Sequence, residues 1–528
     1  MKAALARRIR ARTGGWASQS RLLIAAVLDG HFSIRLLCMQ VTGASGILKW
    51  QQHLILFLVA VVVGTGAAFV TVDLLFPEEE AAISAQDTAQ PYNVVLISID
   101  TLRPDHLQVY GYSRETSPEI DAFFGDSEIW KNAYAPEAST APSVVSLLTG
   151  RLPQNHGVRL FYRRLGKNVP TLADILETHG YDTGAVVSNI VLTAEAIGLD
   201  ERFDHYDDFV DEREGIRKVW ERRASRTTDA ALDWLGKRAP TDAPHFLWVH
   251  YIDPHGPYRS PPDKPRSFSH EGRQEVPLWR IPAYTRLQED PTDGLRYIDR
   301  YDEEIAYMDR EVGRLLDQYK ADGLVENTIF IFTADHGETM IDAEFYFTHG
   351  YDTLEPVMRV PLFVRRPGQP ESVSTDPVST MDIAPSILDW LGFPIPAEMD
   401  GFPLQDRPPE APVSLEATSH GKQIRAIISG DRKWTIRRDG KGNVQSRKMG
   451  QLVDPDSPLA ETIVAEPEAE DWIDTPATEV LEHWMRDDPY PKNLSQPGSA
   501  AQRISGPKVA PGRSQEQIEA LRALGYVE

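Results

Sequence analysis

Short apolar segments of strand type alternate with helical segments along the middle of the chain, and this alternation restricts the fold more than any other feature. The strand-like segments are 93–99, 183–188, 246–249 and 328–333, and the helical ones are 172–179 and 299–320. Strands without a polar face are buried on both sides, and strands separated by helices usually pair in parallel. The sequence therefore predicts an α/β sandwich with a largely parallel central sheet.

Polar residues follow these strands. Asp100 comes after the first strand, Asn189 after the second, the block HYIDPHGPY within 250–258 after the third, and Asp335 with His336 after the last. Ligands of such sheets bind at the carboxyl ends of the strands. A single Asp there is more often a helix cap or a surface acid. Three ligand-type residues at equivalent positions, Asp100, Asp335 and His336, favour a site for a divalent cation.

The segment 139–151, STAPSVVSLLTGR, reads as a short helix that begins near Pro142 and ends at Gly150. Thr140 then lies at the helix N-terminus, where free N–H groups and the helix dipole favour an anion. An ordinary N-cap is a very common use of Thr, and the segment taken alone favours that interpretation of Thr140.

The charge balance excludes one class of function. The net charge is −23, with 55 basic against 78 acidic residues. A nucleic-acid binder needs a basic face for phosphates, so no nucleic-acid partner is expected. Residues 1–50 are the exception, because eight basic residues and one acid give them +7. The single cysteine, Cys38, lies in this segment, so neither an intramolecular disulfide nor a cysteine metal cluster can form.

A membrane anchor is predicted directly after the basic segment. Residues 54–72 carry no charge over 19 residues, which span about 30 Å as a helix. We expect a cytoplasmic segment 1–53, a transmembrane signal anchor 54–76 and a linker 77–91. The remaining chain would lie outside the cytoplasm, either periplasmic or extracellular, because basic residues precede the span. A cleaved signal peptide is the competing interpretation.

Two domains are expected after the linker. The first, 92–405, contains the alternating strands and helices. The second, 410–528, is predicted as a small C-terminal α+β subdomain, because PVSLEATS, IRAIISG and KWTIRR look like short antiparallel strands and QEQIEALRALGY looks like a closing helix.

Five sequence blocks together resemble the sulfatase family of the alkaline phosphatase superfamily. They are VLISIDTLRPDHLQVYGY, TAPSVVSLLTGRLPQNHG, WVHYIDPHGPY, FTADHGE and THGYDTLEPVMRVPLFV, in the family's order and within about 91–400. The resemblance implies an alkaline-phosphatase-like fold. It also implies a metal-dependent hydrolase or transferase of sulfate or phosphate esters, with Ca, Mn or Zn as the cation. The sequence leaves open whether the ester is linked to a lipid or a glycan.

The resemblance also assigns residues. Asp100, Asp335 and His336 match the family's metal ligands, and His255 matches the histidine that meets the substrate anion or the leaving group. His349 falls where relatives place a Lys or His on the anion or on a second metal. Asn189 aligns loosely with substrate-contacting positions. Asp253 is a weaker candidate for a second metal, and His250 is left out of the predicted site as a packing residue.

Two departures from the family pattern concern the nucleophile. Sulfatases of the main type have a Cys or Ser that is oxidised to formylglycine, followed by an Arg, where this chain has Thr140 and Val144. Threonine cannot give the aldehyde. Thr140 instead resembles the threonine nucleophile of the superfamily's phosphodiesterases and head-group transferases. Thr101 stands where many sulfatases have a second metal-binding Asp.

The predicted mechanism is attack by Thr140, activated by a divalent cation on Asp100, Asp335 and His336. His349 and the helix N-terminus would hold the charged oxygens, and His255 would protonate the leaving group. The alternative is a membrane-anchored protein that keeps the sulfatase fold and binds without catalysis. Five polar groups converging on one place favour the enzyme.

Overall fold

The computed structural model describes residues 91–487 apart from 162, 211, 214–219, 239–242, 260–267, 410, 420–421, 453–461 and 466–475. Among these residues, no helix is both long enough and apolar enough to span a bilayer. The predicted segments 1–53 and 54–76 lie outside them, as do the linker up to residue 90 and the expected helix at 515–526.

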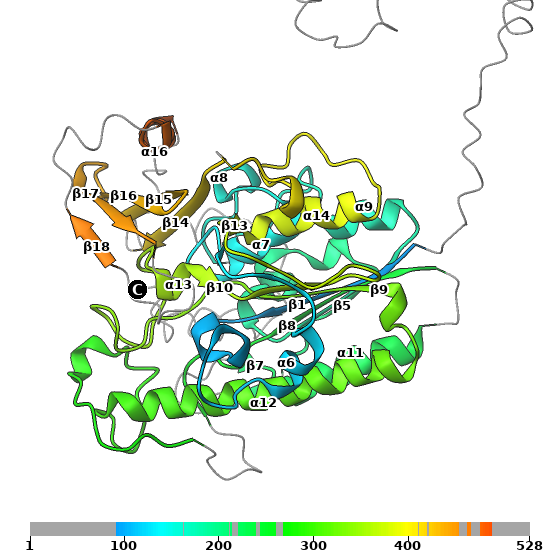
Figure 1. The fold of residues 1–528 in the computed structure, drawn as a ribbon, viewed down its shortest axis with the longest axis horizontal. Helices are drawn as coiled ribbons and strands as arrows, with labels where there is room; N and C mark the ends of the chain where they lie inside the picture. Colours follow the sequence, from blue (N-terminus) through cyan, green and yellow to red (C-terminus); the bar gives the residue numbers. More distant parts are fainter. Residues whose placement is uncertain are drawn as a thin grey trace, which may run out of the picture. The chain divides into compact units, whose positions relative to one another are not determined.

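Eight strands of the described chain form one central sheet, in the order β12-β2-β11-β9-β1-β8-β4-β5 (Figure 1). β1 (Asn93–Ile99) pairs in parallel with β8 (His245–Tyr251) on one side and β9 (Thr328–Ala334) on the other. The parallel arrangement continues through β4 (Asp182–Val187) to β5 (His205–Asp207). The predicted parallel sheet is confirmed in this half.

The other end of the sheet is mixed. β11 (Leu362–Arg365) runs antiparallel to β9 and to β2 (Glu128–Trp130), and β12 (Ser372–Ser374) pairs in parallel with β2. Smaller sheets join β10 (Arg359–Val360), β3 (Ala133–Tyr134) and β13 (Val378–Ser379), and separately β6 (Glu212–Arg213) and β7 (Trp220–Glu221).

Helices cover both faces of the central sheet, as an α/β sandwich requires (Figure 1). One face carries α7 (Thr140–Thr149), α9 (Leu172–Thr178) and α14 (Ile383–Trp390), and the other carries α6 (Pro118–Phe124), α11 (Ala224–Lys237) and α12 (Gly294–Ala321). α12 starts earlier than the apolar pattern indicated, because the Asp293 side chain accepts a hydrogen bond from Leu295 N–H and caps the helix there. Short helices α8 (Pro153–His156), α10 (Ala194–Ile197) and α13 (Glu355–Met358) lie in the connections.

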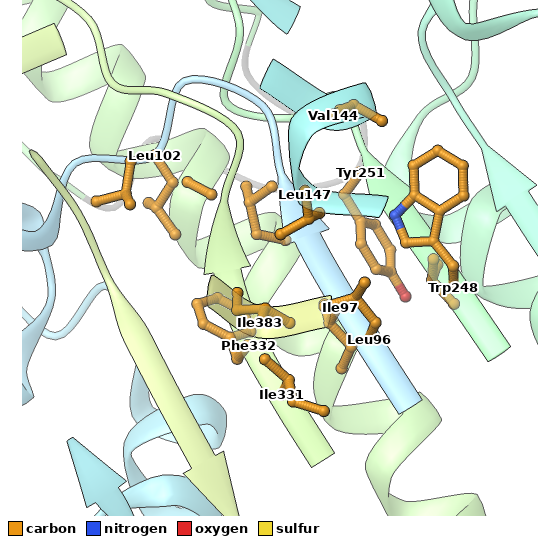
Figure 2. Close-up of a cluster of buried hydrophobic side chains, with 14 of the residues drawn as sticks. Leu96, Ile97, Leu102, Val144, Leu147, Trp248, Tyr251, Ile331, Phe332 and Ile383 are labelled. Carbon is orange, nitrogen blue, oxygen red and sulfur yellow. The ribbon is translucent and has the colours of Figure 1, made fainter. Parts of the chain in front are cut away.

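Apolar side chains form much of the core between the sheet and helix α7. Val144 and Leu147 of α7 and Ile383 of α14 belong to the same buried cluster as Leu96 and Phe332 of the sheet (Figure 2). Val144, which stands where the family has an Arg, is fully buried in this cluster. Packing therefore fixes α7 on the sheet.

A second, antiparallel sheet forms the C-terminal part. Its order is β14-β15-β16-β17-β18, with β14 (Val413–Ser419), β15 (Lys422–Ser429), β16 (Arg432–Arg438), β17 (Val444–Gln451) and β18 (Thr462–Ala465). Helix α16 (Pro476–Asp487) packs Leu481 and Met485 against Trp434 and Ile436 on one face of this sheet. Leu415 and Ile428 on the opposite face pack against Tyr134, which precedes α7 in the chain, and Met358, which follows His349. The expected α+β character of this part is confirmed.

Candidate active site

The carboxyl ends of β1, β8 and β9 bring together the polar residues that the sequence places after its strands. These three strands are neighbours in the sheet and run parallel, so their ends share one edge. The backbone N–H of Asp100 donates to Tyr251 O at 2.9 Å, and that of Asp335 donates to Ile99 O at 3.1 Å. The side chains of Asp100, Asp335 and His336 are buried. The three predicted metal ligands therefore lie at one place.

The orientation of the His336 ring follows from its backbone contact. Nδ1 lies 2.9 Å from Gly337 O, and because a carbonyl only accepts, Nδ1 carries the hydrogen. Nε2 therefore presents a lone pair, 3.5 Å from Asp335 Oδ2 and 4.0 Å from Asp100 Oδ1. Burial and the neighbouring His349 ring lower the pKa of His336 to about 3, so this ring is neutral.

His250 also lies at the site, although the sequence analysis interpreted it as a packing residue. β8 extends two residues beyond the predicted strand, and His250 sits opposite Ser98 in the parallel register. Ser98 Oγ lies 2.9 Å from His250 Nδ1 and accepts a hydrogen bond from Trp248 Nε1 at 2.9 Å. His250 Nε2 lies 3.6 Å from Asp100 Oδ2. The sequence signal for His250 was a polar residue within an apolar strand, next to a strand that ends in a predicted metal ligand.

The donor atoms at this edge fit a divalent cation. One ligand atom each from Asp100, His250 and Asp335 can be chosen so that all lie within 4.8 Å of one another. Asp100 Oδ1, Asp335 Oδ2 and His250 Nε2 are buried, and none has a hydrogen-bond partner among the described residues. Buried polar atoms without partners are costly, and a cation bound by carboxylate oxygens and imidazole nitrogens would satisfy them.

The two carboxylates affect each other's protonation. Burial raises the pKa of Asp335 well above its usual value, and the nearby Asp100 carboxylate raises it further. Burial also acts to raise the pKa of Asp100, but His255, His250 and His336 outweigh it, so this pKa is lowered. Two buried carboxylates this close cannot both stay ionised without compensating positive charge. A divalent cation would supply that charge.

Thr140 lies beside this cluster. Thr140 Oγ1 is 3.2 Å from His336 Nε2, and the side chain is buried. The N-cap of α7 is Ser139, in an extended conformation, and Thr140 is the first helical residue. The alternative that Thr140 serves only as the N-cap is therefore wrong, and its hydroxyl remains for the site. At the other end α7 stops at Gly150, whose positive φ of 63° suits glycine.

Hydrogen bonds of Ser143 and Ser139 hold the segment around Thr140 in place. Ser143 Oγ donates to Asp335 O at 2.5 Å, which ties α7 to the end of β9. Glu137 Oε2 accepts from Ser139 N–H at 3.1 Å and from Ser139 Oγ at 2.5 Å. These contacts fix the backbone immediately before and after Thr140.

Thr101 adopts a backbone conformation that threonine rarely adopts. Its φ is +59°, in the left-handed region where a β-branched residue is strained. Its N–H donates to Asp335 Oδ1 at 3.3 Å, and His336 N–H donates to the same oxygen at 2.8 Å. Strain of this kind persists where surrounding contacts enforce it, most often at functional sites. The turn after Asp100 therefore aims the Asp335 carboxylate.

His349 and His255 complete the ring of imidazoles. The His349 ring centroid lies 4.5 Å from that of His336 and 5.1 Å from that of His255. His349 Nδ1 is 3.2 Å from Glu338 Oε1, and Tyr258 Oη donates to the other oxygen of Glu338. Glu338, fully buried, is a second site residue that sequence reasoning missed, although it closes the FTADHGE block. It fixes the His349 ring as carboxylates fix imidazoles in many metal and catalytic sites.

Two other sequence candidates are placed differently. Asn189 lies at the site, but its Nδ2 donates to Asp100 Oδ2 at 2.5 Å and its Oδ1 accepts from Val191 N–H at 3.0 Å. It orients a predicted ligand, and its contact with substrate stays a prediction. Asp253 pairs with Arg223 Nε at 2.7 Å and accepts from Ala224 N–H at 2.8 Å. It is thus occupied at the start of α11, and the structure does not favour it as a second-metal ligand.

Carboxylates and imidazoles therefore gather around a buried hydroxyl at the strand ends of this α/β sandwich. The sulfatase family model matches residues 92–393, and the chain belongs to the sulfatase family, which is part of the alkaline phosphatase superfamily.

Relatives and solved structures agree with this assignment. Human iduronate 2-sulfatase is 28% identical over 348 residues, covering 55% of this chain and 62% of that protein, which is less than two thirds of its length. An arylsulfatase of Clostridium perfringens is 25% identical over 380 residues, covering 60% of this chain and 78% of that one.

Two solved structures show the same fold. A phosphonate monoester hydrolase from Silicibacter pomeroyi has a TM-score of 0.56 at 20% identity, with 75% of this chain and 96% of that chain covered. A protein solved in complex with its substrate D-glucosamine-2-N,6-O-disulfate has a TM-score of 0.59 at 16% identity, covering 76% of this chain and 99% of that chain.

Proposed function

We propose that this protein hydrolyses sulfate or phosphate esters, with Thr140 as the nucleophile and a divalent cation at the end of the central sheet. The observation that carries the proposal is the position of Thr140 Oγ1, buried 3.2 Å from the neutral Nε2 of His336 and beside the buried carboxylates Asp100 and Asp335. Hydroxyl nucleophiles need an adjacent group that activates them, and this arrangement supplies one.

The cation would be held by Asp100 and Asp335, with His336 as predicted and His250 as an additional imidazole. When bound, it would supply positive charge that favours the ionised hydroxyl and neutralises charge on the ester. Asn189 orients Asp100 through its amide, and the backbone N–H groups of Thr101 and His336 orient Asp335. These contacts hold the two carboxylates without occupying Asp100 Oδ1 or Asp335 Oδ2.

The reaction would proceed in two displacements. Thr140 gives up its hydroxyl proton to solvent, and its Oγ forms a bond to sulfur or phosphorus. The bond to the ester oxygen breaks, and a protonated His255 donates its proton to the leaving oxygen. His349, held by Glu338, contacts the charged oxygens of the transferred group. Water then gives one proton to the neutral His255 and attacks the threonyl ester. The bond between Thr140 Oγ and sulfur or phosphorus breaks, and Oγ takes up a proton from solvent. Transfer to an acceptor alcohol in place of water is the alternative second step.

The site also explains why the formylglycine route does not apply. Threonine has no route to an aldehyde, and Val144 is buried in the apolar core where the family's Arg would lie. An arginine there would have to enter that core, since α7 packs Val144 and Leu147 toward it (Figure 2). Threonine as an unmodified nucleophile suits this environment.

We further propose that residues 54–76 anchor the enzyme in the membrane with the catalytic part outside the cytoplasm. The support is the sequence: an uncharged stretch of 19 residues, preceded by a segment of +7 and followed by three glutamates. The ester would then be a periplasmic or extracellular compound.

The proposal is tested with the purified full-length protein on sulfate monoesters, phosphate monoesters and phosphodiesters, with and without chelator. Thr140→Ala should abolish turnover of every substrate that the wild type hydrolyses, whereas Thr140→Ser should retain measurable turnover because the hydroxyl remains. Mass spectrometry after rapid quenching should locate a sulfate or phosphate group on Thr140. Wild-type turnover by Thr140→Ala would refute the nucleophile assignment and favour a binding protein.

A further inference from the structure

A tyrosine of the long helix α12 contacts the strained turn that follows Asp100. Tyr301 Oη donates to Thr101 O at 2.7 Å and accepts from Arg103 N–H at 2.9 Å. Both roles of the hydroxyl are fixed, because a carbonyl only accepts and an N–H only donates. Tyr301 lies 200 residues after Thr101 in the sequence, so no local pattern predicts this contact. One side chain thus bridges the backbone on both sides of Leu102.

Thr101 is held at both its N–H and its carbonyl. Its N–H donates to Asp335 Oδ1 at 3.3 Å, and its carbonyl accepts from Tyr301. Because the directions of the N–H and the carbonyl of a residue determine its backbone dihedral angles, the two contacts together hold φ at +59°. The strain of such a residue is similar in size to the net contribution of the hydrogen bonds that oppose it. Loss of the Tyr301 contact therefore allows the turn to relax.

The position of the Tyr301 hydroxyl is itself fixed by packing. The side chain is fully buried, and its ring centroid lies 5.0 Å from that of His106 and 5.7 Å from that of Tyr258. Both rings meet it nearly edge to face, at interplanar angles of 85° and 83°. The Tyr258 hydroxyl donates to Glu338, which contacts His349. Tyr301 therefore contacts both the turn after β1 and a tyrosine that binds Glu338.

A second tyrosine of α12 makes the same pair of contacts elsewhere. Tyr297, one helical turn before Tyr301, donates from Oη to Pro291 O at 3.0 Å and accepts from Leu287 N–H at 3.1 Å. It is also fully buried. Its two partners belong to the segment that precedes α12, and neither is a residue of the strand-end site. Tyr297 thus matches Tyr301 in chemistry and burial but lacks the contact with the strained turn.

We propose that Tyr301 is a positioning residue for the cation site: its hydroxyl holds Thr101 in the strained conformation whose N–H fixes the Asp335 carboxylate. The inference rests on the proposed function, because that function requires a cation held by Asp100 and Asp335. Asp335 Oδ1 accepts from the N–H groups of Thr101 and His336, which leaves Oδ2 for the cation. Without the Tyr301 hydroxyl, Thr101 relaxes to a negative φ, its hydrogen bond to Asp335 is lost, and the cation binds less tightly.

The test is Mn²⁺ binding to the metal-free full-length protein, measured by isothermal titration calorimetry for wild type, Tyr301→Phe and Tyr297→Phe. Phenylalanine keeps the ring of each tyrosine and removes only the hydroxyl. The Kd for Mn²⁺ should rise about fivefold in Tyr301→Phe, the effect of losing one hydrogen bond, and stay unchanged in Tyr297→Phe. The Tm of the two metal-free variants should fall by similar amounts, because each loses a hydroxyl with two backbone partners. An unchanged Kd in Tyr301→Phe, or an equal rise in both variants, would overturn the proposal.

Thr101→Gly tests whether backbone strain is the cause. Glycine adopts a positive φ without strain, so Tyr301 has less to oppose in that background. Adding Tyr301→Phe to Thr101→Gly should raise the Kd for Mn²⁺ by less than about twofold, a smaller factor than in the wild-type background. The same factor in both backgrounds would overturn the proposal, while Mn²⁺ binding by the wild type would still support the cation site. No binding of Mn²⁺, Ca²⁺ or Zn²⁺ by the wild type would instead refute the cation site of the proposed function, and this inference with it.

Discussion

Replacement of Glu137 by glutamine should stabilise the protein at neutral pH and leave acid stability unchanged. Glu137 is buried three residues before Thr140 and faces a second buried carboxylate, because its backbone pairs with that of Glu416. Glu416 has its own partner, Arg425 Nη2 at 3.3 Å. Glutamine keeps an oxygen that can accept from Ser139 N–H and Oγ but removes the charge.

The direction of the expected change in the free energy of unfolding follows from the direction of the pKa shift of Glu137. Burial raises the pKa of Glu137 well above the ordinary value of 4.5, and Glu416 adds to the shift. The folded state thus binds the proton more tightly than the unfolded state. The stability due to the protonated group is fully present below pH 4.5 and is lost as the pH rises through the folded pKa. One proton accounts for at most about 1.4 kcal/mol per pH unit, or about 2.7 kcal/mol between pH 5 and 7.

The measurement is urea denaturation of wild type and Glu137→Gln at pH 4, 5, 6, 7 and 8, with Glu177→Gln on the exposed face of α9 as the control for the amide substitution. The free-energy difference between Glu137→Gln and wild type should grow with pH across the interval above 4.5, relative to its value at pH 4. A difference that stays flat with pH would refute the view that Glu137 is a buried, uncompensated carboxylate. Comparison with the wild type cancels contributions of the other acids.

Three further outcomes are expected. Chelation of the bound cation should abolish turnover and lower the Tm. A cation present at 100 times its Kd adds about 2.7 kcal/mol to the free energy of unfolding. An unchanged Tm with unchanged turnover would contradict the metal site. Glu338→Gln should lower kcat by about 10- to 100-fold with KM nearly constant, because Glu338 holds the His349 ring in position. Tyr258→Phe should lower kcat by a smaller factor. Equal kcat in Glu338→Gln and wild type would contradict this positioning role. A reporter enzyme fused after Phe76 should be active only outside the cytoplasm, and protease cleavage of the C-terminal part from the cytoplasmic side would contradict the predicted topology.

The strands of the parallel half could be predicted because their signal is local. β1 is apolar at every position between Val94 and Ile97, and such a run is compatible only with burial on both faces. The antiparallel β11 could not be placed, since pairing with β9 depends on the course of the chain between 335 and 361. α12 also begins earlier in the chain than its apolar pattern predicts, because Asp293 caps the helix there.

The residues of the candidate site also divide into those that a local pattern predicts and those that depend on distant parts of the chain. Asp100, Asp335 and His336 could be predicted because parallel strands deliver their carboxyl ends to one edge. His250 was missed because β8 continues past the apolar run and brings it opposite Ser98. Glu338 was missed because its contact with His349 exists only once the loop 339–348 closes on itself.

No local sequence pattern predicts the contacts between the C-terminal sheet and residues 352–355. Lys433 of β16 lies 3.1 Å from Glu355 Oε1 and also donates to Thr353 O, and Arg437 of the same strand pairs with Asp352. These three partners follow His349 directly in the chain. The Lys433–Glu355 pair is buried and the Arg437–Asp352 pair is partly exposed, and together they hold the C-terminal sheet against the segment that follows His349.

The buried charges also weigh against a protein that only binds. Asp100 and Asp335 are buried at the same strand edge, and two oxygens, Asp100 Oδ1 and Asp335 Oδ2, have no hydrogen-bond partner in the described structure. Replacing such groups with apolar residues of similar size is often neutral or stabilising, so stability alone would not require them. Thr101 adds backbone strain at the same turn. The residues that differ from the family pattern, Thr140, Val144 and Thr101, are buried, while the chain keeps Asp100, Asp335 and His336. Buried carboxylates that stability does not require are expected of the proposed hydrolase, because a protein that had lost catalysis would have no physical reason to keep them buried.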